Sequence, residues 1–350
     1  MKKMPNILFI TSDQQHYNTL GCTNPEIKTP NLDKLAKQGI RFTRAYCTNP
    51  TCTPSRASLI TGKYPGQHGA WALGTKLPET EPTLGQYLSQ AGYRTTLIGK
   101  AHFQQLKDTP EYPSIESNPF MQDLDFWRKF HGPFYGFQRA ELARNHTDEY
   151  HVGQHYAIWM EKKGLKDWRK YFRAPAGTVR HQQRWHWALP EKFHYDTWIA
   201  ERTIKFLRQY HRKNQRFFLW ASFLDPHPPY LVPSPWDTMY DPEKLTVPFG
   251  KPDEHRKNPP HFHLTQLENP DFSPWRESGM GLHGFHSHLP LLKTLRKDLA
   301  VYYGMISLMD KYIGLIIDEL DNLGLSEDTM LVFTTDHGHL IGQHNLAAKG

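Results

Sequence analysis

Asn6-Ile-Leu-Phe-Ile-Thr-Ser-Asp-Gln14 is an apolar run of strand length that stops at an acidic and an amide side chain. The apolar part is too short for the core of a signal peptide, and no small-residue cleavage site follows it. We therefore expect a buried first strand over residues 7–11. Asp13 and Gln14 then stand just beyond its carboxyl end.

The rest of the chain alternates helical patterns with apolar strands. Further strands are expected at 93–98, 217–223 and 330–335. Helices are expected at 30–39, at 57–61 after a turn at Pro54, and at 82–92, 195–211 and 299–323. Apolar strands separated by helices are typical of a mainly parallel sheet with helices on both faces. The predicted fold class is therefore α/β.

Composition agrees with a folded globular protein. The 350 residues are 38% hydrophobic and 13% aromatic, enough for one large domain spanning 1–350 or for two small ones. Mean hydropathy is −0.68, and no apolar run is long enough to indicate a membrane partner. The lack of a signal sequence favours the cytoplasm. The net charge of +7 is scattered, which suits an anionic substrate and does not indicate nucleic-acid binding.

Two stretches lack a clean period and are expected to be irregular insertions, at about 103–190 and 231–290. Such insertions often carry recognition over a site. Their aromatics are expected to pack in the interior, and stacking against a sugar is the alternative. These aromatics are Trp127, Tyr135, Trp159, Trp185 and Trp187.

Three cysteines cannot form a disulfide framework, so at least one is unpaired. Cys22 and Cys47 are expected to be small buried hydrophobic residues. Cys52 is a separate case, because it opens a distinctive motif.

Polar side chains follow three of the expected strands, where functional groups of parallel sheets gather. These are Asp13 and Gln14, Lys100 and His102, and Asp336 and His337. Asp13 and Gln14, together with Asp336 and His337, offer three oxygens and one nitrogen to a divalent cation. Oxygen-rich ligation favours Ca²⁺ or Mg²⁺ over Zn²⁺. The alternative is that the two aspartates cap helices.

The motif Cys52-Thr-Pro-Ser-Arg56, followed by Ala-Ser-Leu-Ile-Thr-Gly62, is long and specific. On its own, a cysteine beside an arginine indicates only an activated thiol. The motif resembles the signature of the sulfatase family, part of the alkaline-phosphatase-like superfamily, in which this cysteine is oxidised to formylglycine (3-oxoalanine). The resemblance implies a formylglycine-generating maturation enzyme as a partner.

Other segments resemble the same family. Gly99-Lys100-Ala101-His102 is similar to its Gly-Lys-x-His element, and Asp225-Pro-His227-Pro-Pro to the segment with a later active-site histidine. The last residues, Gly342 to Gly350, resemble the segment that bears its final lysine, here Lys349. The resemblance runs from residue 6 to the end and is thinnest over the two insertions.

The resemblance implies a site and a reaction. Its catalytic residues would be Cys52, Arg56, Lys100, His102, His227 and Lys349. The metal ligands would be Asp13, Gln14, Cys52, Asp336 and His337, with Ca²⁺ expected first and Mg²⁺ or Mn²⁺ as alternatives. The implied reaction is arylsulfatase-like hydrolysis of a sulfate ester of a carbohydrate or small organic alcohol.

Two departures keep alternatives open. Many sulfatases have two aspartates where this chain has Asp13-Gln14, and related phosphonate monoester hydrolases also have glutamine there. The chain also ends at Gly350, whereas family members are expected to continue into a small C-terminal subdomain. A phosphonate monoester or phosphodiester hydrolase is one alternative. An inactive polyanion-binding member of the fold is another.

Overall fold

The fold is built on one parallel sheet. A computed structural model describes residues 4–105, 110, 113–144, 148–176, 178, 184–248, 250, 251, 253–275, 286–289, 292–347 and 349. Its five strands are β1 (Asn6–Ser12), β2 (Arg94–Gly99), β3 (Arg139–Leu142), β4 (Phe217–Ser222) and β5 (Thr329–Thr335). They lie in the order β3-β2-β4-β1-β5, and every neighbouring pair is parallel. The predicted α/β class is confirmed.

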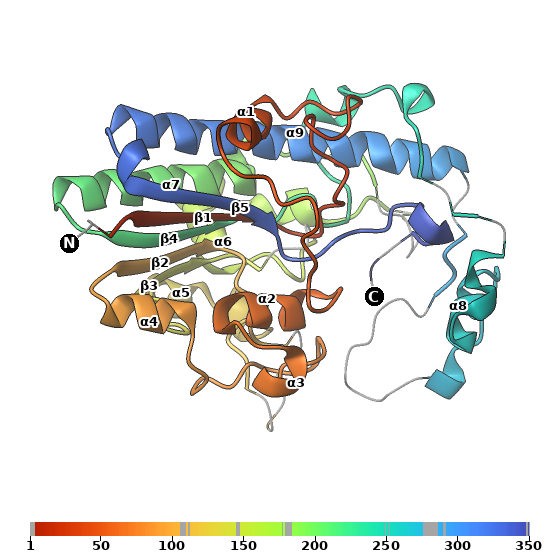
Figure 1. The fold of residues 1–350 in the computed structure, drawn as a ribbon, viewed down its shortest axis with the longest axis horizontal. Helices are drawn as coiled ribbons and strands as arrows, with labels where there is room; N and C mark the ends of the chain where they lie inside the picture. The colour runs from red at the N-terminus through yellow and green to blue at the C-terminus, as the bar shows by residue number, and fades with distance from the viewer. Residues whose placement is uncertain are drawn as a thin grey trace.

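Helices cover both faces of the sheet (Figure 1). One face carries α1 (Pro30–Gln38), α7 (Tyr195–Arg212) and α9 (Leu292–Asn322). The other carries α2 (Cys52–Thr61), α3 (Pro65–His68), α4 (Leu84–Gln90) and α5 (Leu124–Lys129). The chain also forms α6 (Gln154–Lys162), which contacts β3 and α5, and α8 (Pro260–Thr265).

The two faces of the sheet bury two separate apolar clusters. In β4, Leu219 and Ala221 belong to the cluster under α7 and α9, whereas Phe218 and Trp220 belong to the cluster under α2. This alternation is the two-residue period of a strand that is buried on both faces. Each fully buried large side chain contributes roughly 1.5–3 kcal/mol. The central strands are therefore rigid supports for the loops at their ends.

Helix α9 is a core helix. It is long and apolar enough to cross a membrane by length and composition, which the sequence analysis did not anticipate. However, 83% of its most apolar window is buried inside the fold. Its Tyr302 hydroxyl donates to Gln14 O and accepts from His16 N, so the helix also supports the loop after β1.

Two elements differ from their predicted form. Helix α2 begins at Cys52 rather than after a turn at Pro54, because proline is tolerated in the first helical turn, where its missing N–H has no partner to lose. The stretch 103–190, expected to be irregular, contains α5, β3 and α6. Strand β3 is short and lies at the sheet edge, so it lacks the long apolar run of a central strand.

The prediction for two of the cysteines is wrong. Cys22 and Cys47 are free and exposed rather than buried. Cys22 lies in a turn and Cys47 in an irregular surface segment, where Ile40, Phe42 and Tyr46 are also exposed. Cys52 alone of the three is buried.

The insertion aromatics pack as expected. Trp127, Tyr135, Trp159 and Trp187 are all at most 7% exposed and belong to the two apolar clusters. Trp185 is partly buried against the same core. Stacking against a sugar is therefore not the role of the four buried rings in this structure.

Candidate active site

The site forms where the carboxyl ends of the strands meet. Thr11 of β1 and Gly99 of β2 both pair with Ser222 of β4, and Ser12 pairs with Thr335 of β5. The residues immediately after these strands therefore emerge side by side. Asp13, Lys100 and Asp336 are brought together in this way, as the sequence pattern predicted.

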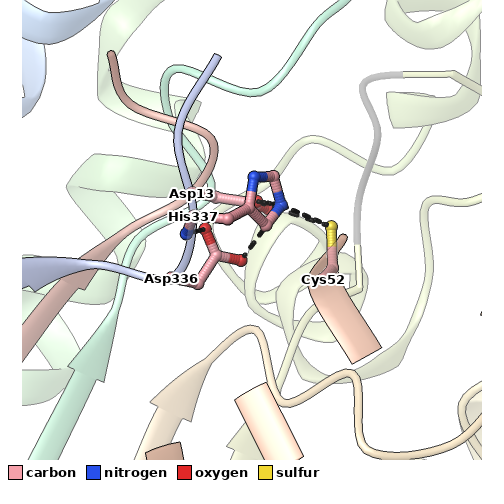
Figure 2. Close-up of side chains that lie close together, drawn as sticks. All are labelled: Asp13, Cys52, Asp336 and His337. Carbon is pink, nitrogen blue, oxygen red and sulfur yellow. Dashed lines mark hydrogen bonds and ion pairs between the residues drawn. The ribbon is translucent and has the colours of Figure 1, made fainter. Parts of the chain in front are cut away.

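Cys52 occupies the first position of α2 and points into this cluster (Figure 2). Its Sγ lies 2.9 Å from Lys349 Nζ, 3.2 Å from His337 Nε2 and 3.8 Å from Lys100 Nζ. The side chain is 1% exposed. A cysteine from one helix thus meets lysines that lie 48 and 297 residues away in the chain.

The surroundings of Cys52 favour its charged form. Burial alone would raise the pKa of the thiol, but the ammonium groups of Lys100 and Lys349 more than offset it. The net effect lowers the pKa of Cys52 to about 6. A site that stabilises a thiolate also attracts other anions, including the oxygens of a sulfate or phosphonate group.

Arg56 lies one helical turn after Cys52, and its guanidinium holds together residues at or just after the ends of three different strands. Its Nε donates to Asp336 Oδ2 at 2.8 Å, and its Nη1 donates to Lys100 O and to Ser222 Oγ at 2.8 and 2.9 Å. The guanidinium thereby joins the ends of three strands. Its side chain is fully buried, so losing it would leave Asp336 and its neighbour Asp13 poorly compensated.

Four of the predicted metal ligands have their ligand atoms close together. The ligand atoms of Asp13, Cys52, Asp336 and His337 all lie within 4.8 Å of one another and are buried (Figure 2). The two carboxylates do not cap helices. Asp13 instead pairs with Lys100, and Asp336 pairs with Arg56.

Gln14, the fifth predicted ligand, supplies independent evidence for a cation. Its Oε1 is buried and has no hydrogen-bond partner within the described part of the chain. Its main chain is held firmly at a positive φ of 61°, with its N–H donating to Asp336 Oδ1 at 2.9 Å. A buried carbonyl oxygen without a donor is costly unless something binds it. The donor set therefore fits a hard divalent cation.

His337 has the orientation of a metal ligand. Its Nδ1 lies 2.9 Å from Gly338 O, an atom that can only accept, so Nδ1 carries the proton and Nε2 faces the cluster. Metal-binding histidines generally donate their second N–H in this way. Burial lowers the pKa of His337, but the carboxylate of Asp336 outweighs it and the net shift is upward.

His227 and Lys349 form a pair beside Cys52. The Nδ1 of His227 faces Pro228 O and therefore carries the proton. Its Nε2 then accepts from Lys349 Nζ at 3.1 Å. Burial and the neighbouring charge of Lys349 hold the pKa of His227 well below its usual range. In this arrangement the proton available to a leaving group sits on Lys349.

His102 is positioned through its main chain. Its N–H and those of Phe103 and Gln104 donate to the carboxylate of Glu116, at 2.6, 2.9 and 3.1 Å. These bonds hold His102 at a positive φ of 57° just after β2. Glu116 is 1% exposed, so the turn bearing His102 is fixed by a buried carboxylate.

Sequence reasoning missed three residues of this region: Ser222, Glu116 and Arg144. Ser222 ends β4 and binds Arg56, but a serine at a strand end is too common to signal a role. Glu116 and Arg144 lie in the stretch that lacked a recognisable period. The available signal for Arg144 was the short run Arg139-Ala-Glu-Leu142, because a charged residue follows it closely, as at the ends of the other strands.

Comparison with known proteins gives a consistent result. The sulfatase family model matches residues 5–350. The chain is 29% identical to the uncharacterized sulfatase YidJ of Escherichia coli K12, covering 99% of this chain and 60% of that protein. It is 28% identical to an arylsulfatase of Clostridium perfringens, covering 99% of this chain and 65% of the relative.

Among solved structures, the fold is similar to that of the phosphonate monoester hydrolase SpPMH from Silicibacter pomeroyi. The TM-score is 0.74 at 25% identity, and the match covers 99% of this chain and 66% of that one. The chain therefore spans about 60–66% of the length of these relatives.

Proposed function

Because the chain belongs to the sulfatase family, we propose that it hydrolyses sulfate esters of a carbohydrate or a small organic alcohol. Cys52, matured to formylglycine by a separate enzyme, is the proposed nucleophile. The observation that carries this proposal is the placement of Cys52 Sγ against Lys349 and Lys100, beside a cluster of metal-type ligands.

The proposed reaction uses the hydrated aldehyde at position 52. One of its hydroxyl groups releases its proton to solvent and attacks the sulfur, the bond from sulfur to the ester oxygen breaks, and the leaving alcohol takes a proton from the Lys349–His227 pair. His102 then removes the proton of the second hydroxyl. The aldehyde forms again, its bond to the sulfate oxygen breaks, and sulfate leaves. The covalent step replaces one difficult displacement by two easier ones.

The other residues act on charge and position. Lys100 and Lys349 neutralise the oxygens of the sulfuryl group as negative charge moves. Arg56 orients the hydrated aldehyde. Asp13, Gln14, Asp336 and His337 would hold a divalent cation, for which Ca²⁺ is proposed first. Such a cation supplies Lewis acidity and lowers the pKa of a hydroxyl bound to it.

Phosphonate monoester hydrolysis is the second candidate. The likeness to SpPMH and the neutral amide of Gln14 in the ligand set favour it. Sulfate esters and phosphonate monoesters both present a single negative charge to the same cationic site. Binding affinity alone would therefore distinguish the two substrates poorly. The inactive polyanion-binding alternative has the least support, because it leaves this complete set of site residues without a use.

The test compares an aryl sulfate with the matching aryl phosphonate monoester, using the whole protein matured at Cys52. The variant Cys52→Ala is the control, because it removes the nucleophile from a site whose other charges remain. We expect a higher kcat/KM for the sulfate and loss of that turnover in the variant.

Two results would change the proposal. A preference for the phosphonate would keep the nucleophile and replace the reaction by the second candidate. Turnover of the sulfate by Cys52→Ala at the wild-type rate would contradict the role of Cys52 altogether.

A further inference from the structure

Strand β3 also delivers a charged residue to the site edge. Leu142 at its end pairs with Gly99 of β2, and Ala143 N–H donates to Gly99 O at 3.0 Å. Arg144 is the second residue after β3, whereas Lys100 is the first residue after β2. The strand alternation places it on the same face as Leu142, which packs in the cluster under α2. Arg144 therefore lies on the Cys52 side of the sheet.

One side of the Arg144 guanidinium is anchored. Its Nη1 donates to the main-chain O of Glu116 at 2.8 Å. Both oxygens of the Glu116 carboxylate accept main-chain N–H groups of residues 102–104, and Arg144 binds the main-chain O of Glu116 instead. The anchor fixes the direction of the planar group through a neutral carbonyl oxygen.

The opposite edge of the same guanidinium makes no hydrogen bond within the described residues. Within the described part of the chain, Arg144 Nε and Nη2 have no hydrogen-bond partner, although the residue is only 1% exposed. These two atoms form the fork that binds a carboxylate or sulfate through parallel hydrogen bonds. Two other arginines of this chain use the same fork on a carboxylate. Arg202 uses it to hold Glu141, and Arg208 uses it to hold Glu319.

The charges around Arg144 also indicate a missing anion. Burial lowers the pKa of Arg144 to about 10, and the attraction of Glu116, Cys52 and Asp13 only partly opposes this shift. Arg56 adds repulsion. A buried cation with two unused donors is costly until an oxyanion meets it.

We propose that the Nε–Nη2 edge of Arg144 binds a second oxyanion of the substrate, next to the sulfate ester that is cleaved. This inference rests on the proposed function and narrows it. The substrate class becomes a sulfate ester with a neighbouring acidic group, either a carboxylate or a further sulfate, rather than a simple monoanionic ester.

The experiment measures kcat/KM for three substrates with the matured protein: a uronic acid sulfate, its methyl ester, and a disulfated neutral sugar. The first pair differs only in the carboxylate, and the third tests a second sulfate as the source of the oxyanion. We expect the acidic substrate to be preferred over the ester. Arg144→Gln should reduce that preference about 10–100-fold, since a charge-assisted bidentate contact contributes roughly 1.5–3 kcal/mol.

Arg144→Lys keeps the charge and loses the fork, so we expect a partial loss of preference and a folded protein. Equal loss of kcat/KM for acidic and esterified substrates in Arg144→Gln would overturn the proposal. So would a wild-type protein that prefers neither acidic substrate.

If no substrate is turned over, the proposed function fails, and calorimetric binding of the same compounds to Cys52→Ala and to Cys52→Ala with Arg144→Gln still decides the inference. Tighter binding of the acidic compounds that disappears with Arg144→Gln would support it. Equal affinities in the two proteins would overturn it.

Discussion

The two ends of the sheet use the same cationic residue types differently. At the carboxyl end, Arg56 and Lys100 are fully buried, and each contacts a carboxylate. At the amino end, a groove of about 420 Å³ is lined by cations such as Arg94, Lys205 and Lys213, which are exposed to water. Water screens the second set, whereas the interior leaves the first set at full strength. The comparison teaches that burial and direction, rather than the number of charges, distinguish a candidate active site from a basic surface.

The largest expected difference in turnover is between removing a lysine at the carboxyl end of the sheet and removing one at the amino end. Lys349→Ala should lower turnover about 100–1,000-fold, the usual cost of losing one preorganised electrostatic donor. Lys205→Ala removes the same charge from the groove and should leave kcat and KM unchanged. Steady-state kinetics on the two matured variants checks this. Similar losses in both would break the contrast between the ends.

The second largest expected effect is the loss of stability when a closely packed glycine is replaced by alanine. A Cβ on Gly99 would lie 1.9 Å from Ser222 O, and the residue has a φ of +99°. Gly99→Ala should therefore destabilise the fold by at least about 3 kcal/mol. Gly92 precedes β2 at the other end and has a φ of +85° with open space around it. Gly92→Ala should cost only about 1–2 kcal/mol. Urea denaturation of both variants measures the difference, and equal costs would contradict it.

A buried ion pair away from the site should affect stability but not chemistry. Burial raises the pKa of Glu141, but Arg202 and Arg139 outweigh it and lower the value to about 2. A lowered folded-state pKa contributes stability that is full above the unfolded value near 4.5 and is lost as pH falls toward 2. Glu141→Gln should cost about 3 kcal/mol at neutral pH and progressively less in acid.

The measurement for Glu141→Gln is the free energy of unfolding at neutral pH and at several acidic values. A cost that does not change with pH would show that shape rather than charge explains it. Turnover of the folded variant should match the wild type, because Glu141 belongs to the edge strand and touches none of the predicted site residues described above.

The smallest effect is expected on the surface of α7. Arg208 Nε and Nη2 donate to the carboxylate oxygens of Glu319 at 2.7 and 2.8 Å, as Arg202 does to Glu141. The side chain of Arg208, however, is 59% exposed. Because water and salt screen such a pair, Arg208→Gln should shift the denaturation midpoint little, and not at all at high salt. A shift as large as that of Glu141→Gln would mean that exposure does not separate the two pairs.

The sequence was sufficient for the sheet and for the residues at its strand ends. Long apolar strands such as β4 can be recognised from composition alone, and parallel pairing brings the residues beyond their carboxyl ends to one edge. This logic gathered Asp13, Lys100, Asp336 and His337 from distant segments. Their roles, the identity of the cation and the cytoplasmic location remain predictions.

Other features depend on contacts that no local pattern encodes. Strand β3 is four residues long and carries charged side chains, so it resembles a loop until its neighbour β2 is in place. Arg144 was therefore not recognised as a residue that follows a strand, and Glu116 lies in an irregular loop whose contacts with residues 102–104 form only in the fold. Likewise, only the positions of Pro228 O and Lys349 fix which nitrogen of His227 carries its proton.

The left-handed backbone at Gln14 has a consequence for substitution at this position. Asp336 holds its N–H and Tyr302 holds its carbonyl, so the conformation belongs to the scaffold rather than to the glutamine. Asparagine, aspartate or glycine could inherit the position with little strain, but valine, isoleucine or threonine could not. Replacing Gln14 by aspartate would therefore change the charge of the cluster by one unit and leave the shape of the turn in place.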